Sequence, residues 1–165
     1  MTTLSTLLLP ELEAEMKSTR RILAALPETD AEFKPHEKSR PLAKLASHIV
    51  DVASFPAFIL TTPGYDPTVA PRKPSVMESK AQLLAQFDEN AALSIAALSQ
   101  SSDEDLQHPW SFTRGEYTIY SGPRYGAYRA MGLNHLIHHR AQLGCYIRDL
   151  NLPLPGTYGP SADGM

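Results

Sequence analysis

The sequence predicts an all-α protein whose helices form a four-helix bundle, and three observations lead to this expectation. Four stretches carry apolar residues three and four positions apart, the period of a helix that buries one face. Each stretch is bounded by residues that break helices, mainly proline and glycine. The 165 residues, 42% hydrophobic and 20% charged, suit one domain (1–165) with its own core. Several amphipathic helices in one domain of this size typically pack as a bundle.

The first expected helix covers residues 3–26. Its apolar positions recur with a helical period, and its charged residues, Glu15 among them, are expected on the solvent face. Pro10 either kinks the first turns or lies in the opening turn of a helix that starts near it. The apolar positions are Leu4, Leu8, Leu12, Met16, Ile22, Leu23 and Leu26.

The second expected helix begins at Pro41, because proline fits the first turn of a helix, and it ends near Thr62. At roughly 100° per residue, His48 falls inside the apolar arc and therefore faces the core. A proline-rich crossing follows. Ser75 and Glu78 have the spacing of a capping box, which places the start of a third helix there and its end near Ser99.

Residues 101–123 break the helical pattern and are expected to form a long irregular loop before the last helix. Alternating aromatic and aliphatic residues in this loop could form a small hairpin. A fourth helix is expected from Gly122–Pro123 to about Leu150. Because some connections have a dozen or more residues, at least one crossover is expected.

Composition excludes several classes of function. The net charge of −3 argues against binding to nucleic acid, which needs a basic face. Cys145 is the only cysteine, so no internal disulfide can form. No apolar stretch approaches the ~20 residues of a membrane span, and the apolar N-terminus lacks the basic leader of a signal peptide. The sequence therefore predicts a cytoplasmic protein without a membrane or nucleic-acid partner.

Three histidines are the candidate metal ligands. His135 and His139 are four residues apart on the fourth helix, so their side chains rise from the same face one turn apart. His48, facing the core from the second helix, could supply a third imidazole, whereas His138 lies further round towards solvent. Three imidazoles leave one position of a tetrahedral ion open, as catalytic sites do. Imidazole ligation suits a divalent ion: Zn or Ni is favoured, with Fe, Mn or Cu as alternatives.

The alternative is that these histidines only pack in the core. One pair of histidines four apart is a weak signal by itself, but a core-facing His48 needs a polar partner. Gln142 shares the line of the histidine pair and could bond a ligand. Asp51 is a candidate for orienting an imidazole, or is simply solvated. Tyr128 is a candidate for lining the pocket. Three further residues are expected to be ordinary loop or helix positions: His36, His108 and Cys145.

The combination of these features resembles the DinB/YfiT-like superfamily of metalloenzymes. The resemblance rests on His48 in Leu-Ala-Ser-His-Ile, on the block from His135 to Gln142, on residues 34–39, and on the tail of residues 155–163. It covers nearly the whole chain. One departure is Gly164, which follows Asp163 where relatives tend to carry an acidic residue.

The resemblance implies a four-helix bundle with up-down-down-up connectivity, often dimeric. It also implies a divalent metal held by His48, His135 and His139. Some relatives use a low-molecular-weight thiol such as bacillithiol or mycothiol for transfer or isomerisation. The expected function is therefore metal-dependent transfer of a thiol to a small molecule, or hydrolysis of a small molecule. The loop 107–122 and the tail are expected to shape the pocket. The alternative is a non-catalytic dimer that binds a metal or a small ligand.

Overall fold

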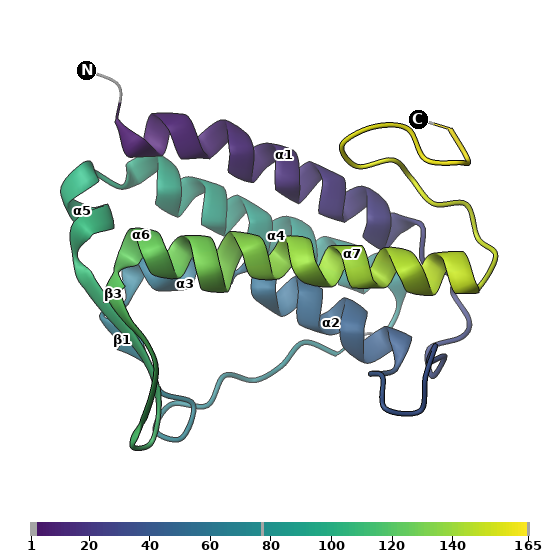
Figure 1. Cartoon of the computed structure of the whole chain (residues 1–165), viewed down its shortest axis with the longest axis horizontal. Coiled ribbons are helices and arrows are strands. Elements are labelled where there is room, and N and C mark those ends of the chain that lie inside the picture. The colour runs from purple at the N-terminus through teal and green to yellow at the C-terminus, as the bar shows by residue number, and fades with distance from the viewer. Residues whose placement is uncertain (1–2, 77, 165) are drawn as a thin grey trace.

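The structure is a computed structural model that describes residues 3–76 and 78–164. It is mostly helical, and its long helices lie side by side along the long axis of the molecule (Figure 1). The long helical segments are α1 (Leu4–Ala24), α2 (Leu42–Ala53) followed by the shorter α3 (Phe55–Thr61), α4 (Lys80–Gln100), and α7 (Asn134–Asp149), which continues α6 (Arg124–Ala127) and the π-helical η1 (Tyr128–Leu133).

The main core lies where these helices pack against one another. Helix α1 packs against α4 and α7, and α2 packs against the same two helices. Fully buried aliphatic side chains fill the space between them, and each stabilises the fold by about 1.5–3 kcal/mol relative to an exposed position. They include Leu12, Leu23, Leu45, Ile49, Leu98, Leu143 and Ile147.

One helix start agrees with the sequence-based expectation of a helix over residues 3–26, and another differs. Helix α1 begins before Pro10 and continues through it, capped by Thr3, whose Oγ1 accepts from the Thr6 N–H at 3.2 Å. The start of the third helix was predicted wrongly: α4 begins at Lys80, and its cap is Ser79, whose Oγ accepts from the Gln82 N–H at 3.2 Å. Ser79 and Gln82 have the same capping-box spacing as Ser75 and Glu78, so the pattern alone could not choose between them.

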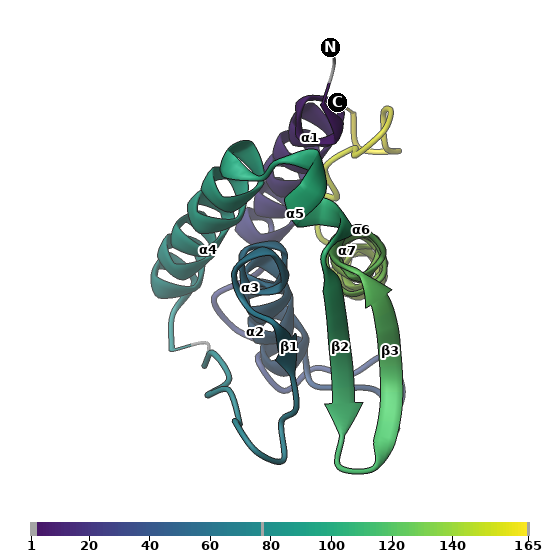
Figure 2. The same ribbon diagram turned by 90° about the vertical axis from the view of Figure 1, so that its left-hand side faces the viewer.

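The segment expected as an irregular loop contains the short helix α5 (Asp103–Gln107) and two strands, so the all-α expectation was wrong here. Strands β2 (Pro109–Arg114) and β3 (Tyr117–Pro123) form an antiparallel hairpin, and β1 (Gly64–Tyr65) pairs in parallel with β2. Figure 2 shows this small sheet projecting from one end of the helices. The hairpin turns at Gly115, whose φ of 60° favours glycine.

Asp66 joins the tip of the hairpin to the loop after β1. Its Oδ2 accepts from the Thr113 hydroxyl and from the Gly115 N–H, each at 3.0 Å. Its Oδ1 accepts from the Thr68 hydroxyl at 2.6 Å and from the Thr68 N–H at 2.8 Å. These hydrogen bonds hold the pKa of Asp66 below its usual range, chiefly through Thr68. The carboxylate therefore fixes the far end of a hairpin that otherwise has few neighbours.

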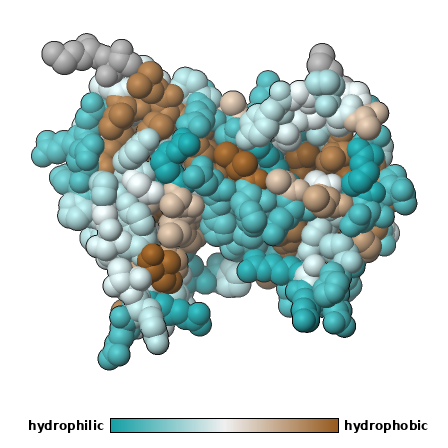
Figure 3. Space-filling view, viewed as in Figure 1, coloured by the Kyte–Doolittle hydropathy of each residue, from teal (hydrophilic) through white to brown (hydrophobic). Residues whose placement is uncertain are grey.

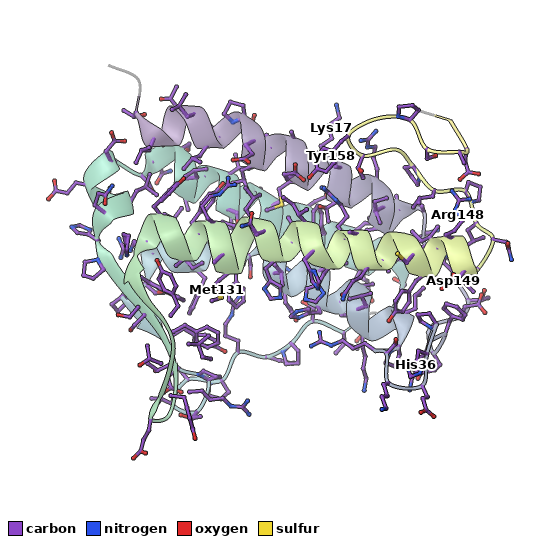
Figure 4. The ribbon with its side chains drawn as sticks, in the orientation of Figure 1. Lys17, His36, Met131, Arg148, Asp149 and Tyr158 are labelled. Carbon is purple, nitrogen blue, oxygen red and sulfur yellow. The ribbon has the colours of Figure 1, made fainter. Side chains whose placement is uncertain are left out.

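The C-terminal tail returns to α1 through Tyr158, which lies beside Lys17 in Figure 4. The Tyr158 hydroxyl donates to Glu15 Oε1 at 2.9 Å and accepts from the Arg140 guanidinium at 2.7 Å, and Arg140 also pairs directly with Glu15. Glu15 and Arg140 are 7% and 3% exposed. The expectation that Glu15 faces solvent was therefore wrong.

By length and composition alone, one helical stretch could cross a membrane. The expectation that the chain has no such stretch was therefore wrong. This stretch is Leu42–Thr61, which covers α2 and α3. More than half of its residues are buried against the other helices. Packing inside this fold therefore accounts for its apolar composition.

Candidate metal centre

The structure brings His48 together with His135 and His139 where α2 packs against α7. The Nε2 atoms of His48 and His135 are 3.4 Å apart, and those of His135 and His139 are 2.8 Å apart. One nitrogen from each ring lies within 4.8 Å of the other two, and all three side chains are half-buried. Two distant parts of the sequence therefore present three imidazole nitrogens to one point.

The π-helical segment η1 ends directly before the helix that carries two of these histidines. A π-helix closes i to i−5 hydrogen bonds, so it takes more residues per turn and shifts the face on which later side chains lie. The Asn134 N–H accordingly donates to the Arg129 carbonyl. Met131, labelled in Figure 4, lies in this segment, and its carbonyl accepts from His135 Nδ1 at 3.3 Å. The segment thus sets both the position and the ring orientation of His135.

Hydrogen bonds at Nδ1 determine where the ring protons lie. A carbonyl can only accept, so His135 carries its proton on Nδ1. His139 Nδ1 likewise donates to Gln142 Oε1 at 2.7 Å. In the neutral rings both Nε2 atoms are then unprotonated, and two lone pairs face each other across 2.8 Å. This arrangement is repulsive unless a cation lies between the two nitrogens.

A divalent ion fits this donor set. Bonds of about 2.0–2.1 Å from a tetrahedral ion to two imidazoles place the nitrogens about 3.3 Å apart. The pairs at 3.4 and 2.8 Å bracket this value. The set also has the outer partners of metal-bound histidines, because two of its rings donate their other N–H to an oxygen. The side chains present can therefore hold such an ion with small movements.

The three imidazoles are kept neutral by their surroundings. Burial, assisted by the charges of His139, Arg40 and His135, lowers the pKa of His48 to about 4. Burial is also the main cause that lowers the pKa of His135 and of His139. A metal ligand must be unprotonated, so these rings can bind an ion at neutral pH without first losing a proton.

A cavity of about 580 Å³ opens beside His48. It is lined by apolar residues and by polar groups that include the charged side chains of Glu32, Arg40, Lys44 and Asp51. Figure 3 shows a hollow in the surface between the projecting hairpin and the loop that joins α1 to α2. A smaller apolar hollow of about 450 Å³ lies against the tail, includes Cys145 and Tyr158, and shares no residue with this cavity. The tail therefore lines a different part of the surface.

The remaining sequence candidates lie elsewhere or act differently. His138 is exposed, as expected, and His36 and His108 are exposed in connecting segments; Figure 4 shows His36 on the loop between α1 and α2. Asp51 lines the cavity, but its Oδ1 accepts from the Ser75 N–H at 2.9 Å. Tyr128 is fully buried with no hydrogen-bond partner among the described residues, and burial raises its pKa.

Sequence reasoning missed one of the two partners that orient the rings. The Met131 carbonyl carries no side-chain signal, and only the π-helical segment brings it to His135. Gln142 was a candidate for lining the pocket or supporting a ligand, and it bonds His139 from one turn away. Its spacing of three from His139 on a helix is compatible with this contact.

The chain is similar to known proteins in its sequence and in its fold. A family model described as the DinB superfamily matches residues 11–143. No curated protein matches the chain. Among solved structures, a DinB-like protein from Bacillus cereus ATCC 10987 has a TM-score of 0.71 at 21% identity, covering 94% of this chain and 98% of its own. A DinB-like protein from Bacillus subtilis, YjoA, has a TM-score of 0.69 at 17% identity, covering 89% and 96%. These two structures share the fold.

Proposed function

The chain belongs to the DinB superfamily, and from this premise we propose that it is a metal-dependent enzyme acting on a small molecule. His48, His135 and His139 would hold one divalent ion, with zinc or nickel favoured over iron, manganese or copper. The reaction is S-transfer from a low-molecular-weight thiol to a small electrophile, or hydrolysis of such a molecule.

One observation carries this proposal: the unprotonated Nε2 atoms of His135 and His139 face each other at 2.8 Å, with His48 Nε2 beside them. Core packing alone does not favour this arrangement, because buried polar atoms normally face a partner of opposite polarity. A shared cation relieves the repulsion between the lone pairs. The site therefore has the donors, the tautomers and the neutral rings that a metal needs.

The protein's own groups hold the site in place. Gln142 and the Met131 carbonyl fix two rings, and the packing of α2 against α7 brings His48 to them. When bound, a divalent ion with an open position lowers the pKa of a coordinated thiol or water and so produces a nucleophile at neutral pH.

A second cluster of apolar and aromatic side chains lies under the hairpin, outside the residues that line the cavity. It includes the partly buried Met131, whose carbonyl contacts His135. An apolar cluster beside the site is compatible with a substrate that has an apolar part. Its members include Phe55, Phe58, Tyr65 and Phe112.

A second candidate is a non-catalytic, metal- or ligand-binding dimer. Leu7 of α1 and Leu93 of α4 are 64% and 55% exposed, although large apolar side chains are more often buried. The packing of α1 against α4 could offer these side chains to a second copy. A homodimer is compatible with either function, so its presence would not separate the two.

The finer features of the architecture and location are also proposals. The up-down-down-up order of a four-helix bundle is supported by the packing of α1 and α2 against both α4 and α7. A cytoplasmic location without nucleic-acid or membrane partners is supported by the net charge of −3 and by the burial of most of Leu42–Thr61.

The test of the catalytic proposal is turnover by tag-free protein reconstituted with zinc or nickel. A panel of thiols with small electrophiles and a panel of esters and amides are assayed in parallel. We expect turnover that disappears in His48→Ala and persists in His138→Ala, since His138 is an exposed histidine on the same helix as the other two ligands. Stoichiometric metal binding without turnover on either panel would support the non-catalytic binding protein instead.

A further inference from the structure

Two cationic side chains and the first histidine of the site form a line along the start of α2. Arg40, Lys44 and His48 follow one another at intervals of four residues, and Arg40 directly precedes Pro41, the cap of α2. Lys44 and His48 are four apart within α2 and therefore lie on the same face. All three line the cavity of about 580 Å³, so the cationic groups approach the metal centre through this cavity.

Neither cation has an acidic partner within the described parts of the chain. No carboxylate oxygen lies within 4.0 Å of the Arg40 guanidinium or the Lys44 ammonium among residues 3–76 and 78–164. Both residues are exposed. The Asp51 carboxylate in the same cavity accepts from the Ser75 N–H instead. The two positive charges are therefore free to pair with a ligand.

Arg40 has a fixed anchor next to the site. Its backbone carbonyl accepts from the Tyr146 hydroxyl of α7 at 3.0 Å, and the Tyr146 ring packs edge-on against Phe33. The charge of Arg40 also contributes to the lowered pKa of each of the three histidines. The guanidinium is thus close enough to influence all three imidazoles.

The cavity is lined by two cations, Arg40 and Lys44, and by two carboxylates, Glu32 and Asp51. Imidazole ligands are neutral, so a bound divalent ion keeps its full charge and gives the occupied cavity a net positive charge. The remaining lining residues are His48, two serines and four apolar residues: Ala31, Ala43, Pro74 and Val76. A cavity of this volume is within the range of small-molecule sites. An occupant with one acidic group and a short apolar body complements these features.

We propose that this cavity binds a small organic carboxylate, whose acid group pairs with Arg40 and Lys44 while its other end reaches the ion held by the histidines. This substrate class rests on the proposed metal-dependent function. Arginine binds carboxylates through two parallel N–H···O bonds, which explains how a guanidinium at one end of the cavity would orient such a ligand.

The test uses cobalt(II)-reconstituted protein and a series of mercapto acids with two to five methylene groups, each compared with its methyl ester. The thiolate-to-cobalt absorption band reports the metal end of the ligand for acid and ester alike. We expect at least one acid to bind about tenfold or more tightly than its ester, as charge-assisted hydrogen bonds allow. Arg40→Gln and Lys44→Gln should remove this preference and leave the binding of the ester unchanged.

Lys17→Gln is the matched control, because it removes one exposed positive charge on α1, outside the cavity. It should leave the preference intact, and Arg40→Lys should retain part of it. Equal binding of acid and ester at every length, unaltered by Arg40→Gln, would overturn the inference while leaving the metal function standing.

The absence of a thiolate band would count against the thiol-dependent function. In that case a separate titration still tests whether the cavity binds carboxylates. Calorimetry then compares simple alkyl carboxylates with their primary amides in the same protein. A preference for the acids that Arg40→Gln and Lys44→Gln remove would support the inference on its own. The absence of such a preference would overturn it.

Discussion

His135 Nε2 lies 2.8 Å from His139 Nε2, and in both rings the opposite nitrogen donates to an oxygen. The partner of His139 is a side chain, Gln142 Oε1, at 2.7 Å. This hydrogen bond fixes the proton on Nδ1 and so leaves Nε2 free for a metal. The metal affinity of the site therefore depends on Gln142, a residue that would not contact the ion itself.

Replacing Gln142 by leucine should weaken metal binding about 10–100-fold, because the ring of His139 loses the acceptor that sets its tautomer and orientation. Gln142→Glu keeps an acceptor and should retain affinity. Competition with a chelating dye measures both constants. Gln107→Leu, an exposed glutamine on α5, is the control. Equal affinity in Gln142→Leu and wild type would show that the hydrogen bond has no influence on the metal.

Acid should destabilise the metal-free protein over a defined pH window. The pKa of His48 is about 4 when folded, against an ordinary 6.5. Between these values the unfolded chain binds one more proton than the folded protein, so the free energy of unfolding falls as the pH falls. The neutral ring thus contributes stability that is present above pH 6.5 and is lost towards pH 4.

Urea titrations of chelated protein between pH 7 and 5 measure this effect. The free energy of unfolding should fall less in His48→Gln than in wild type, because the substituted side chain does not titrate. His138→Gln removes an exposed histidine and should behave like wild type. Identical pH dependence in wild type and His48→Gln would contradict the assigned cause.

The buried pair of Glu15 and Arg140 should be the most sensitive polar contact in the core. Arg140→Ala leaves the Glu15 carboxylate without its charged partner and should cost about 3–5 kcal/mol of stability. Tyr158→Phe removes only one hydroxyl and should cost about 1 kcal/mol. Chemical denaturation gives both values. Arg129→Ala breaks the more exposed pair with Glu11 and should cost less than about 1 kcal/mol; a larger loss there than in Arg140→Ala would refute this ranking.

The hairpin should open locally when its tip is released. Asp66→Ala removes the charged acceptor shared by the Thr113 hydroxyl and the Gly115 N–H. Amide hydrogen exchange in residues 109–123 should become about tenfold faster, while exchange in α4 stays unchanged. Asp103→Ala is a control on a different segment, since this carboxylate caps the Leu4 N–H. Unchanged exchange in the hairpin would show that Asp66 does not hold it.

The helices could be predicted from the sequence because the period of their apolar residues depends only on helix geometry. The same geometry placed His135 and His139 on one face and His48 towards the core, and the structure brings these three side chains together. Glu15 was misplaced although it lies on the buried line of Leu8, Leu12, Thr19 and Ile22. Its charge suggested solvent, and only the distant Arg140 explains its burial.

Other features depend on contacts that no local pattern encodes. The π-helical segment adds one residue to the helix between two regular stretches. The apolar residues around Gly132 still recur at intervals that an ordinary helix allows, so the sequence does not reveal this segment. Gly132 allows this segment to approach α3, where a Cβ would meet Pro56 at 3.2 Å. The hairpin was only suggested by alternation, because its strands are held partly by Asp66 and by the burial of Trp110 against α3 and α6.

The metal content of tag-free protein tests the central claim most directly. Elemental analysis after purification without a histidine tag should find about one divalent ion per chain. That ion should be lost in His48→Ala, His135→Ala and His139→Ala and retained in His138→Ala. The account would be contradicted if the wild-type protein contained no metal and bound none of zinc, nickel, iron, manganese or copper when each is supplied, while all four variants kept the same fold and stability.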